Sequence, residues 1–217
     1  MENDRAAPPE SAADDSSIGV DRIIAFSDAV FAVAITLLVL NIDVPQVSRQ
    51  LADVKLPAEI WALWPKFAAF IVSFLIIGFF WAFHHMMFKN IRRHTNLFLW
   101  MNLLLLMCIV FMPFSAALFS EYTTTEVATM FYAASWAVPS FLLALMWWYA
   151  TDNKRLVDEQ YKAISGRHAT FAFLNTGFIF LLSMPIAIIN VGAAQYFWLM
   201  LIPTHFLLGR YFGKRGA

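Results

Sequence analysis

The side chains of this sequence that are best suited to chemistry lie inside apolar stretches. Ser27 and Asp28 interrupt the apolar run of residues 22–42, and two adjacent histidines, His84 and His85, lie near the end of another such run. An ionisable group inside a membrane helix is costly, and by default it marks a functional site with a partner. These residue types would suit a proton relay, a hydrolytic triad, a metal site or a hydrogen-bonded support, and their spacing narrows the choice.

The spacing argues against enzyme and metal chemistry. Ser27 and Asp28 are neighbours on a helix, so their side chains diverge by about 100° and cannot easily both orient His84 as a triad requires. His84 and His85 are adjacent, so they lack the four-residue, same-face spacing of helical zinc ligands. The sequence also contains no Gly-Lys-Ser/Thr phosphate loop and no Gly-x-Gly-x-x-Gly turn. We therefore expect no enzyme activity and no cofactor.

A proton-coupled or cation secondary transporter is an alternative interpretation. Asp28 together with His84 or His85 could relay protons near neutral pH. Transporters commonly contain internal repeats, whereas the second half of this sequence does not resemble the first. A single buried acid also leaves little room for alternating access.

The elements that carry these residues are predicted to be membrane helices. Hydrophobic residues make up 60% of the 217 residues and charged residues only 14%, against roughly one quarter charged residues in a soluble domain. One span requires about 20 apolar residues, and such stretches recur along the chain. They predict an all-α membrane protein with six spans, at about residues 22–42, 61–88, 95–120, 127–151, 168–190 and 193–212. We expect residues 21–213 to form one domain, between a disordered acidic tail at 1–20 and a basic tail at 214–217.

Basic residues between the predicted spans indicate the orientation, because Lys and Arg resist translocation. Of the 15 basic residues, all but Arg49, Lys55 and Lys66 fall on the side that holds both termini. Both termini are therefore expected to be cytoplasmic. Basic loops without a targeting signal fit the inner (plasma) membrane of a prokaryote. The formal net charge of zero gives no basic excess for binding nucleic acid.

The order of the spans predicts partners for Ser27 and Asp28. The second span runs inward and the third starts at the same inner surface, so several polar residues should lie near the depth of this pair: His84, His85, His94, Asn96 and Asn102. We expect Asp28 to hold the first helix against the second and third spans through His or Asn donors.

The first helix has two different faces. At about 100° per residue, one arc holds Phe26, Ala29, Val30, Val33, Thr36, Leu37 and Leu40, whereas Asp28, Phe31, Ile35 and Leu38 lie opposite. If the first arc lines a central pathway, Asp28 supports that pathway from behind. By periodicity alone, such an apolar stripe more often indicates ordinary helix packing.

Two segments of the sequence resemble a known family. Residues 22–45, RIIAFSDAVFAVAITLLVLNIDVP, closely resemble the first helix of the transmembrane protein 175 family, the endolysosomal potassium channels and their prokaryotic relatives. The core of that signature is an arginine, three residues and then Phe-Ser-Asp, here Arg22, Phe26, Ser27 and Asp28. Residues 81–114, WAFHHMMFKNIRRHTNLFLWMNLLLLMCIVFMPF, resemble the end of the second helix, the basic loop and the third helix of bacterial members. The other three spans match in number and spacing.

The resemblance implies a channel in which the first helices of several subunits surround the pore axis. The Thr-Val-Gly-Tyr-Gly filter of common potassium channels does not occur in this sequence. In relatives the pore narrows at large apolar side chains, and the matching positions are Val33, Leu37 and Leu40, with Thr36 offering a hydroxyl group. K⁺ would pass near Val33, Thr36 and Leu37, through an apolar ring that gates by expelling water.

The resemblance also implies a homotetramer. Vertebrate relatives carry two copies of the six-helix unit per chain and act as dimers, whereas the Phe-Ser-Asp signature occurs once here. One candidate pore helix per chain can enclose an axial pathway only by symmetric repetition. We therefore expect a potassium-permeable, weakly to moderately selective leak channel in the lipid bilayer. Its partners would be copies of itself and monovalent cations, with the permeating K⁺ as its only ligand.

Overall fold

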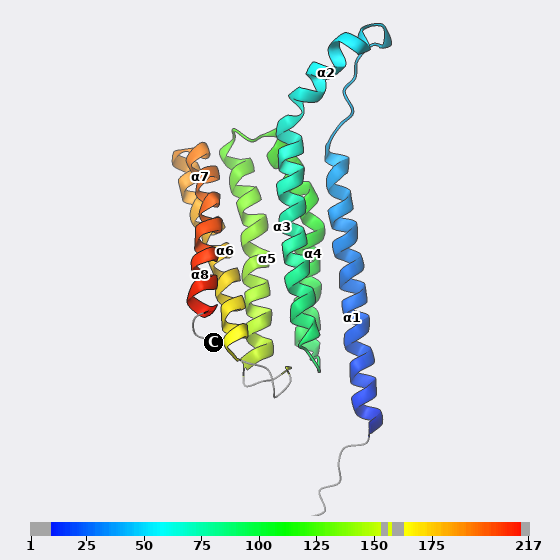
Figure 1. The fold of residues 1–217 in the computed structure, drawn as a ribbon, viewed down its shortest axis with the longest axis vertical. Coiled ribbons are helices and arrows are strands. Elements are labelled where there is room, and N and C mark those ends of the chain that lie inside the picture. Colours follow the sequence, from blue (N-terminus) through cyan, green and yellow to red (C-terminus); the bar gives the residue numbers. More distant parts are fainter. Residues whose placement is uncertain (1–9, 153–155, 158–162, 214–217) are drawn as a thin grey trace, which may run out of the picture.

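The protein is a bundle of helices. The computed structural model describes residues 10–152, 156–157 and 163–213, and nearly all of them are helical. Within these residues, 6 helical segments are long and apolar enough to cross a membrane, which confirms the all-α, six-span prediction. Figure 1 shows them side by side, with the start of α1 and the end of α8 at the same end of the bundle. That this end is cytoplasmic stays a prediction from the basic loops.

The spans follow the predicted ranges closely. The first consists of α1 (Glu10–Leu37) and a 3₁₀ turn (Leu38–Asn41). The next four are α3 (Trp64–Lys89), α4 (Asn96–Glu121), α5 (Glu126–Thr151) and α6 (Ala163–Ile189). The sixth consists of α7 (Val191–Phe197), a 3₁₀ turn (Trp198–Met200) and α8 (Leu201–Gly213).

Three boundaries differ from the prediction. First, α1 begins at Glu10, so residues 10–20 are helical rather than part of a disordered tail; acidic residues near a helix N-terminus favour helix formation. Second, residues 61–62 belong to a separate helix, α2 (Ala52–Ala62), that precedes α3. Third, the sixth span changes to 3₁₀ geometry just before Pro203, which has no N–H to bond the carbonyl four residues earlier. The predicted tail residues 1–9 and 214–217 lie outside the described residues.

Short polar side chains explain where three helices begin. Thr95 Oγ1 accepts a hydrogen bond from the Phe98 N–H at the start of α4. Thr125 Oγ1 accepts from the Ala128 N–H at the start of α5, and Asn190 Oδ1 accepts from the Ala193 N–H at the start of α7. Each cap pairs an N–H group that has no partner inside the helix.

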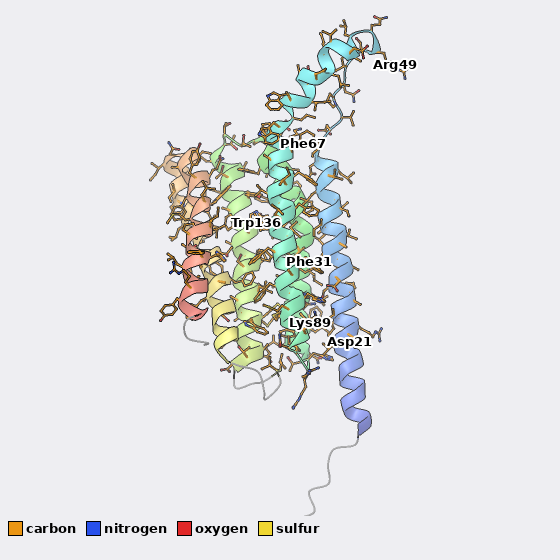
Figure 2. The ribbon with its side chains drawn as sticks, viewed as in Figure 1. Asp21, Phe31, Arg49, Phe67, Lys89 and Trp136 are labelled. Atoms are coloured by element: carbon orange, nitrogen blue, oxygen red, sulfur yellow. The ribbon has the colours of Figure 1, made fainter. Side chains whose placement is uncertain are left out.

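The core is centred on α5. Trp136 and Trp147 of this helix are fully buried, and Figure 2 shows Trp136 in the middle of the bundle. Aromatic rings connect the helices around it: Phe83 of α3 lies 4.2 Å from Phe173 of α6, measured between ring centroids, and Phe80 contacts both Trp136 and Phe173. By contrast α1 lies at the edge of the bundle, where it packs on α3 and α4. One side of α1 is therefore left without a protein neighbour.

Candidate ion pathway and its polar anchors

One face of α1 is buried and carries a serine among apolar residues. Phe31, Ala34 and Leu38 are at most 1% exposed, and Ser27 is 0% exposed. Figure 2 shows Phe31 on the side of α1 that faces α3 and α4. These positions follow the three- and four-residue spacing of one helix face. A hydroxyl group on that face must find a partner in the neighbouring helices or in its own backbone.

Ser27 is one end of a buried hydrogen-bonded chain through three helices. Its hydroxyl donates to the Ile23 carbonyl at 2.8 Å and accepts from Asn102 Nδ2 of α4 at 3.0 Å. The Asn102 side-chain oxygen lies 2.8 Å from His84 Nε2 of α3, and both His84 and Asn102 are buried. Because that oxygen can only accept, His84 carries its proton on Nε2. Asn102 thus joins α1, α3 and α4.

Asp28 lies outside this chain and is held by a different part of α3. The indole N–H of Trp81 donates to Asp28 Oδ1 at 2.9 Å. His85 Nδ1 lies 3.8 Å from Asp28 Oδ2, within ion-pair range if the ring is protonated, and the imidazole stacks on Trp81. The Asp28 side chain is 35% exposed. Sequence reasoning missed Trp81; its only signal was its place one turn before His85.

Two predicted partners do not belong to either group. His94 lies against Gly19 of α1, where a Cβ on the glycine would come within 2.8 Å of the imidazole. Asn96 is exposed at the start of α4. At about 1.5 Å of rise per residue, Asn102 lies about 9 Å further into the bundle than Asn96. The prediction was wrong for His94 and Asn96 because they sit at the bundle end, short of the depth of Ser27.

A second set of contacts holds the opposite end of the first span. Asn41 Nδ2 donates to the Pro113 carbonyl of α4 at 2.9 Å. Lys66 Nζ of α3 lies 3.0 Å from Glu121 Oε2 of α4 and 3.4 Å from Asp43 Oδ2, just after the first span. These contacts were not predicted from the sequence. The first span is therefore attached to α3 and α4 by polar groups near both of its ends.

The remaining face of α1 is exposed along its length. The exposed fraction is 55% for Phe26, 54% for Val33, 38% for Leu37 and 71% for Leu40. Thr36 is also exposed, and its hydroxyl donates to the Val33 carbonyl at 2.8 Å. That bond uses the hydroxyl proton, so the oxygen of this exposed side chain can still accept a hydrogen bond or a cation. Arg22, also exposed, lies on the same side one turn before Phe26.

The site offers hydrogen-bond donors and apolar surface rather than a metal centre. Among the described residues, no three His, Cys, Asp or Glu side chains are grouped so that they could hold a metal ion. What the arrangement provides is a membrane helix fixed in rotation by polar contacts on one side, with an exposed and largely apolar face on the other. This defines a membrane protein with six spans, in which polar contacts hold the first helix against α3 and α4 while its opposite face has no neighbour among the described residues.

Comparison with known proteins identifies the family. The family model described as "Endosomal/lysosomal potassium channel TMEM175" matches residues 22–113. A potassium channel from Streptomyces collinus is 32% identical over 200 residues, which cover 88% of this chain and 90% of that protein. A potassium channel from Chamaesiphon minutus is 39% identical over 142 residues, covering 64% of this chain and 70% of that protein.

A solved structure agrees in fold. The crystal structure of a lysosomal potassium-selective channel TMEM175 homolog from Chamaesiphon minutus superposes with a TM-score of 0.68 at 32% identity, covering 91% of this chain and 97% of that one. The chain belongs to the TMEM175 family. This is a family of ion channels and not of enzymes.

Proposed function

We propose that this chain is one subunit of a potassium-permeable cation channel that conducts passively through a central pore. The observation that carries the proposal is the uncovered apolar face of α1, at the edge of a bundle whose relatives from Streptomyces collinus and Chamaesiphon minutus are named potassium channels. Val33, Leu37 and Leu40 on this face would form the apolar constriction, with the Thr36 hydroxyl beside them. Water leaves a narrow apolar ring readily, so modest widening would admit a hydrated cation.

Copies of α1 are suited to pack against each other. Ala25, Ala29 and Ala32 are exposed and recur at helical spacing, along the flank of the stripe of larger side chains at Val33 and Leu37. Small residues let membrane helices approach closely. We propose a homotetramer in a prokaryotic inner membrane. One pore helix per chain encloses an axis only through symmetric repetition, and the number four follows by analogy with the two-repeat relatives that act as dimers. The basic loops favour cytoplasmic termini.

The proton-coupled transporter is not favoured. His84 bonds Asn102 instead of Asp28, and Asp28 is held by Trp81. Among the described residues, Asp28 and His84 therefore share no hydrogen bond or ion pair, and the titratable side chain beside Asp28 is His85. The relatives from Streptomyces collinus and Chamaesiphon minutus are named as potassium channels.

Potassium flux into liposomes tests the proposal. Under a potassium gradient, with sodium substituted in parallel samples, Leu37→Ala and Val33→Ala should each raise flux and weaken discrimination of potassium from sodium. Leu182→Ala on α6 is the matched control, because Leu182 is 53% exposed, close to the value of Val33, and should leave flux unchanged. Unchanged flux in both α1 variants would reject this face as the pore lining. Thr36→Ala would separate the contribution of the hydroxyl group.

A further inference from the structure

The segment between α1 and α3 extends beyond the bundle. It contains a 3₁₀ turn (Arg49–Leu51) and α2 (Ala52–Ala62), and none of the residues in these two elements is buried. Figure 1 shows α2 above the end of the bundle, leaning toward the α1 side, and Figure 2 shows Arg49 at its far tip. Within the chain, α2 contacts this 3₁₀ turn and α3. We call residues 49–62 the projecting segment.

This segment exposes large apolar side chains outside the six candidate membrane spans of the structure. Val54 is 79% exposed and Trp61 is 76% exposed, and they lie seven residues apart, on one face of α2. An isolated helix of 11 residues is marginal in water, and most helices in proteins are stabilised by packing of an apolar face. A helix with this exposed face therefore calls for a partner.

The direction of the projecting segment argues for a protein partner over a lipid surface. Only Leu63, with α-like backbone angles, separates α2 from α3. The 26 residues of α3 alone rise about 39 Å at about 1.5 Å per residue, against a bilayer core of about 30 Å, so α2 starts beyond the length needed to cross it. A helix that rises away from the bundle end in this way does not lie along the membrane plane as an interfacial helix does.

The charges of the segment are complementary to a second copy of itself. Arg49, Asp53, Lys55 and Glu59 are all exposed, and none of them takes part in an ion pair among the described residues. Two basic and two acidic side chains within eleven residues carry no net charge, so two neighbouring copies can pair without repulsion. A strongly basic or acidic partner would leave half of these charges unmatched.

We propose that the projecting segment packs against the corresponding segment of the neighbouring subunit and forms a collar around the outer entrance of the pore. The proposal rests on the proposed function, in which copies of α1 surround a shared axis, because α2 leans toward that same side. The Val54 and Trp61 face forms the apolar part of the contact. The four charged side chains form its rim.

Site-specific photocrosslinking of the full chain in its membrane tests the collar. The photoreactive amino acid p-benzoylphenylalanine replaces one residue at a time: Val54 or Trp61 in the segment, Leu40 on the α1 face, and Val127 as control. Val127 is 75% exposed and is the second residue of α5, a helix whose first turn lies at the same end of the bundle as α2 but away from α1. We expect crosslinked dimers from positions 54, 61 and 40, and only monomer from position 127.

The crosslink at position 40 distinguishes failure of the collar from failure of the proposed pore. Dimers from position 40 with only monomer from both 54 and 61 would overturn the collar and leave the pore assignment standing. Monomer from all four positions would overturn both. Lipid adducts at 54 and 61, detected as a mass increase of the monomer, would show that the segment contacts the membrane, and would also overturn the collar.

Discussion

Asn102 is the residue whose removal most directly tests whether polar contacts position the first helix. Its side chain bonds Ser27 of α1 and His84 of α3, so Asn102→Ala removes two interhelical hydrogen bonds. Such bonds in membranes contribute about 0.6 kcal/mol on average and up to about 1.7. The loss is therefore about 1 to 3 kcal/mol, which corresponds to roughly a 5- to 150-fold change in an equilibrium.

Thermal unfolding of the purified protein and potassium flux in liposomes measure the two consequences separately. Ser73→Ala is the control, because buried Ser73 makes one hydrogen bond with Tyr132, at 3.2 Å, that connects α3 to α5 and does not involve α1. We expect both variants to unfold at lower temperature than the wild type. Only Asn102→Ala should also alter flux per channel and the preference for potassium over sodium. If Asn102→Ala is destabilised but conducts as the wild type does, the buried chain does not position the pore helix.

Further predictions concern the other contacts of the bundle. Asp28→Asn keeps an oxygen that accepts from Trp81, so potassium flux should persist; loss of all flux, with the protein still folded, would favour a proton relay. Trp81→Phe removes that donor. It should lower the free energy of unfolding by about 0.6 to 1.7 kcal/mol, and with it the unfolding temperature. Lys66→Met removes two partly exposed ion pairs, worth at most about 1 kcal/mol each, so its effect on unfolding should fade at high salt. Gly177→Ala should cost about 1 to 3 kcal/mol because its Cβ would meet the Phe141 ring at 2.7 Å; Gly78→Ala, with nothing within 4 Å, should not destabilise.

Helical periodicity was enough to predict which residues of α1 share a face. The period of 3.6 residues is a property of the backbone, so the exposure of Val33, Leu37 and Leu40 opposite buried Phe31 and Leu38 follows from their spacing. That these exposed residues line a pore stays a prediction. The depth argument also anticipated Asn102 near Ser27, because both lie one to two turns into their spans.

Contacts that depend on helix rotation were not predictable in this way. Trp81 was overlooked because an aromatic residue in a span is usually accounted for by lipid or core packing, and its N–H finds Asp28 only at one rotation of α3. Lys66 pairs with Asp43 and Glu121. These three residues belong to segments whose ends meet only when the bundle forms. The spacing of residues in the sequence predicts which side chains share a face of one helix. Which side chains pair between helices depends on how the helices are rotated and packed against each other.

Polar contacts have unusual weight in setting the position of α1. Between its anchors, at Ser27 and Asp28 on one end and at Asn41 and Asp43 on the other, the buried face is apolar. Apolar contact between membrane helices gains little over contact with lipid, since lipid tails are equally apolar. Packing alone thus holds α1 weakly against rotation, and the hydrogen bonds at the two ends set its rotation and hence which side chains face away from the bundle. Any opening motion that turns α1 must break or exchange these bonds, so variants that weaken the anchors should affect conduction more than equally destabilising changes between α5 and α6.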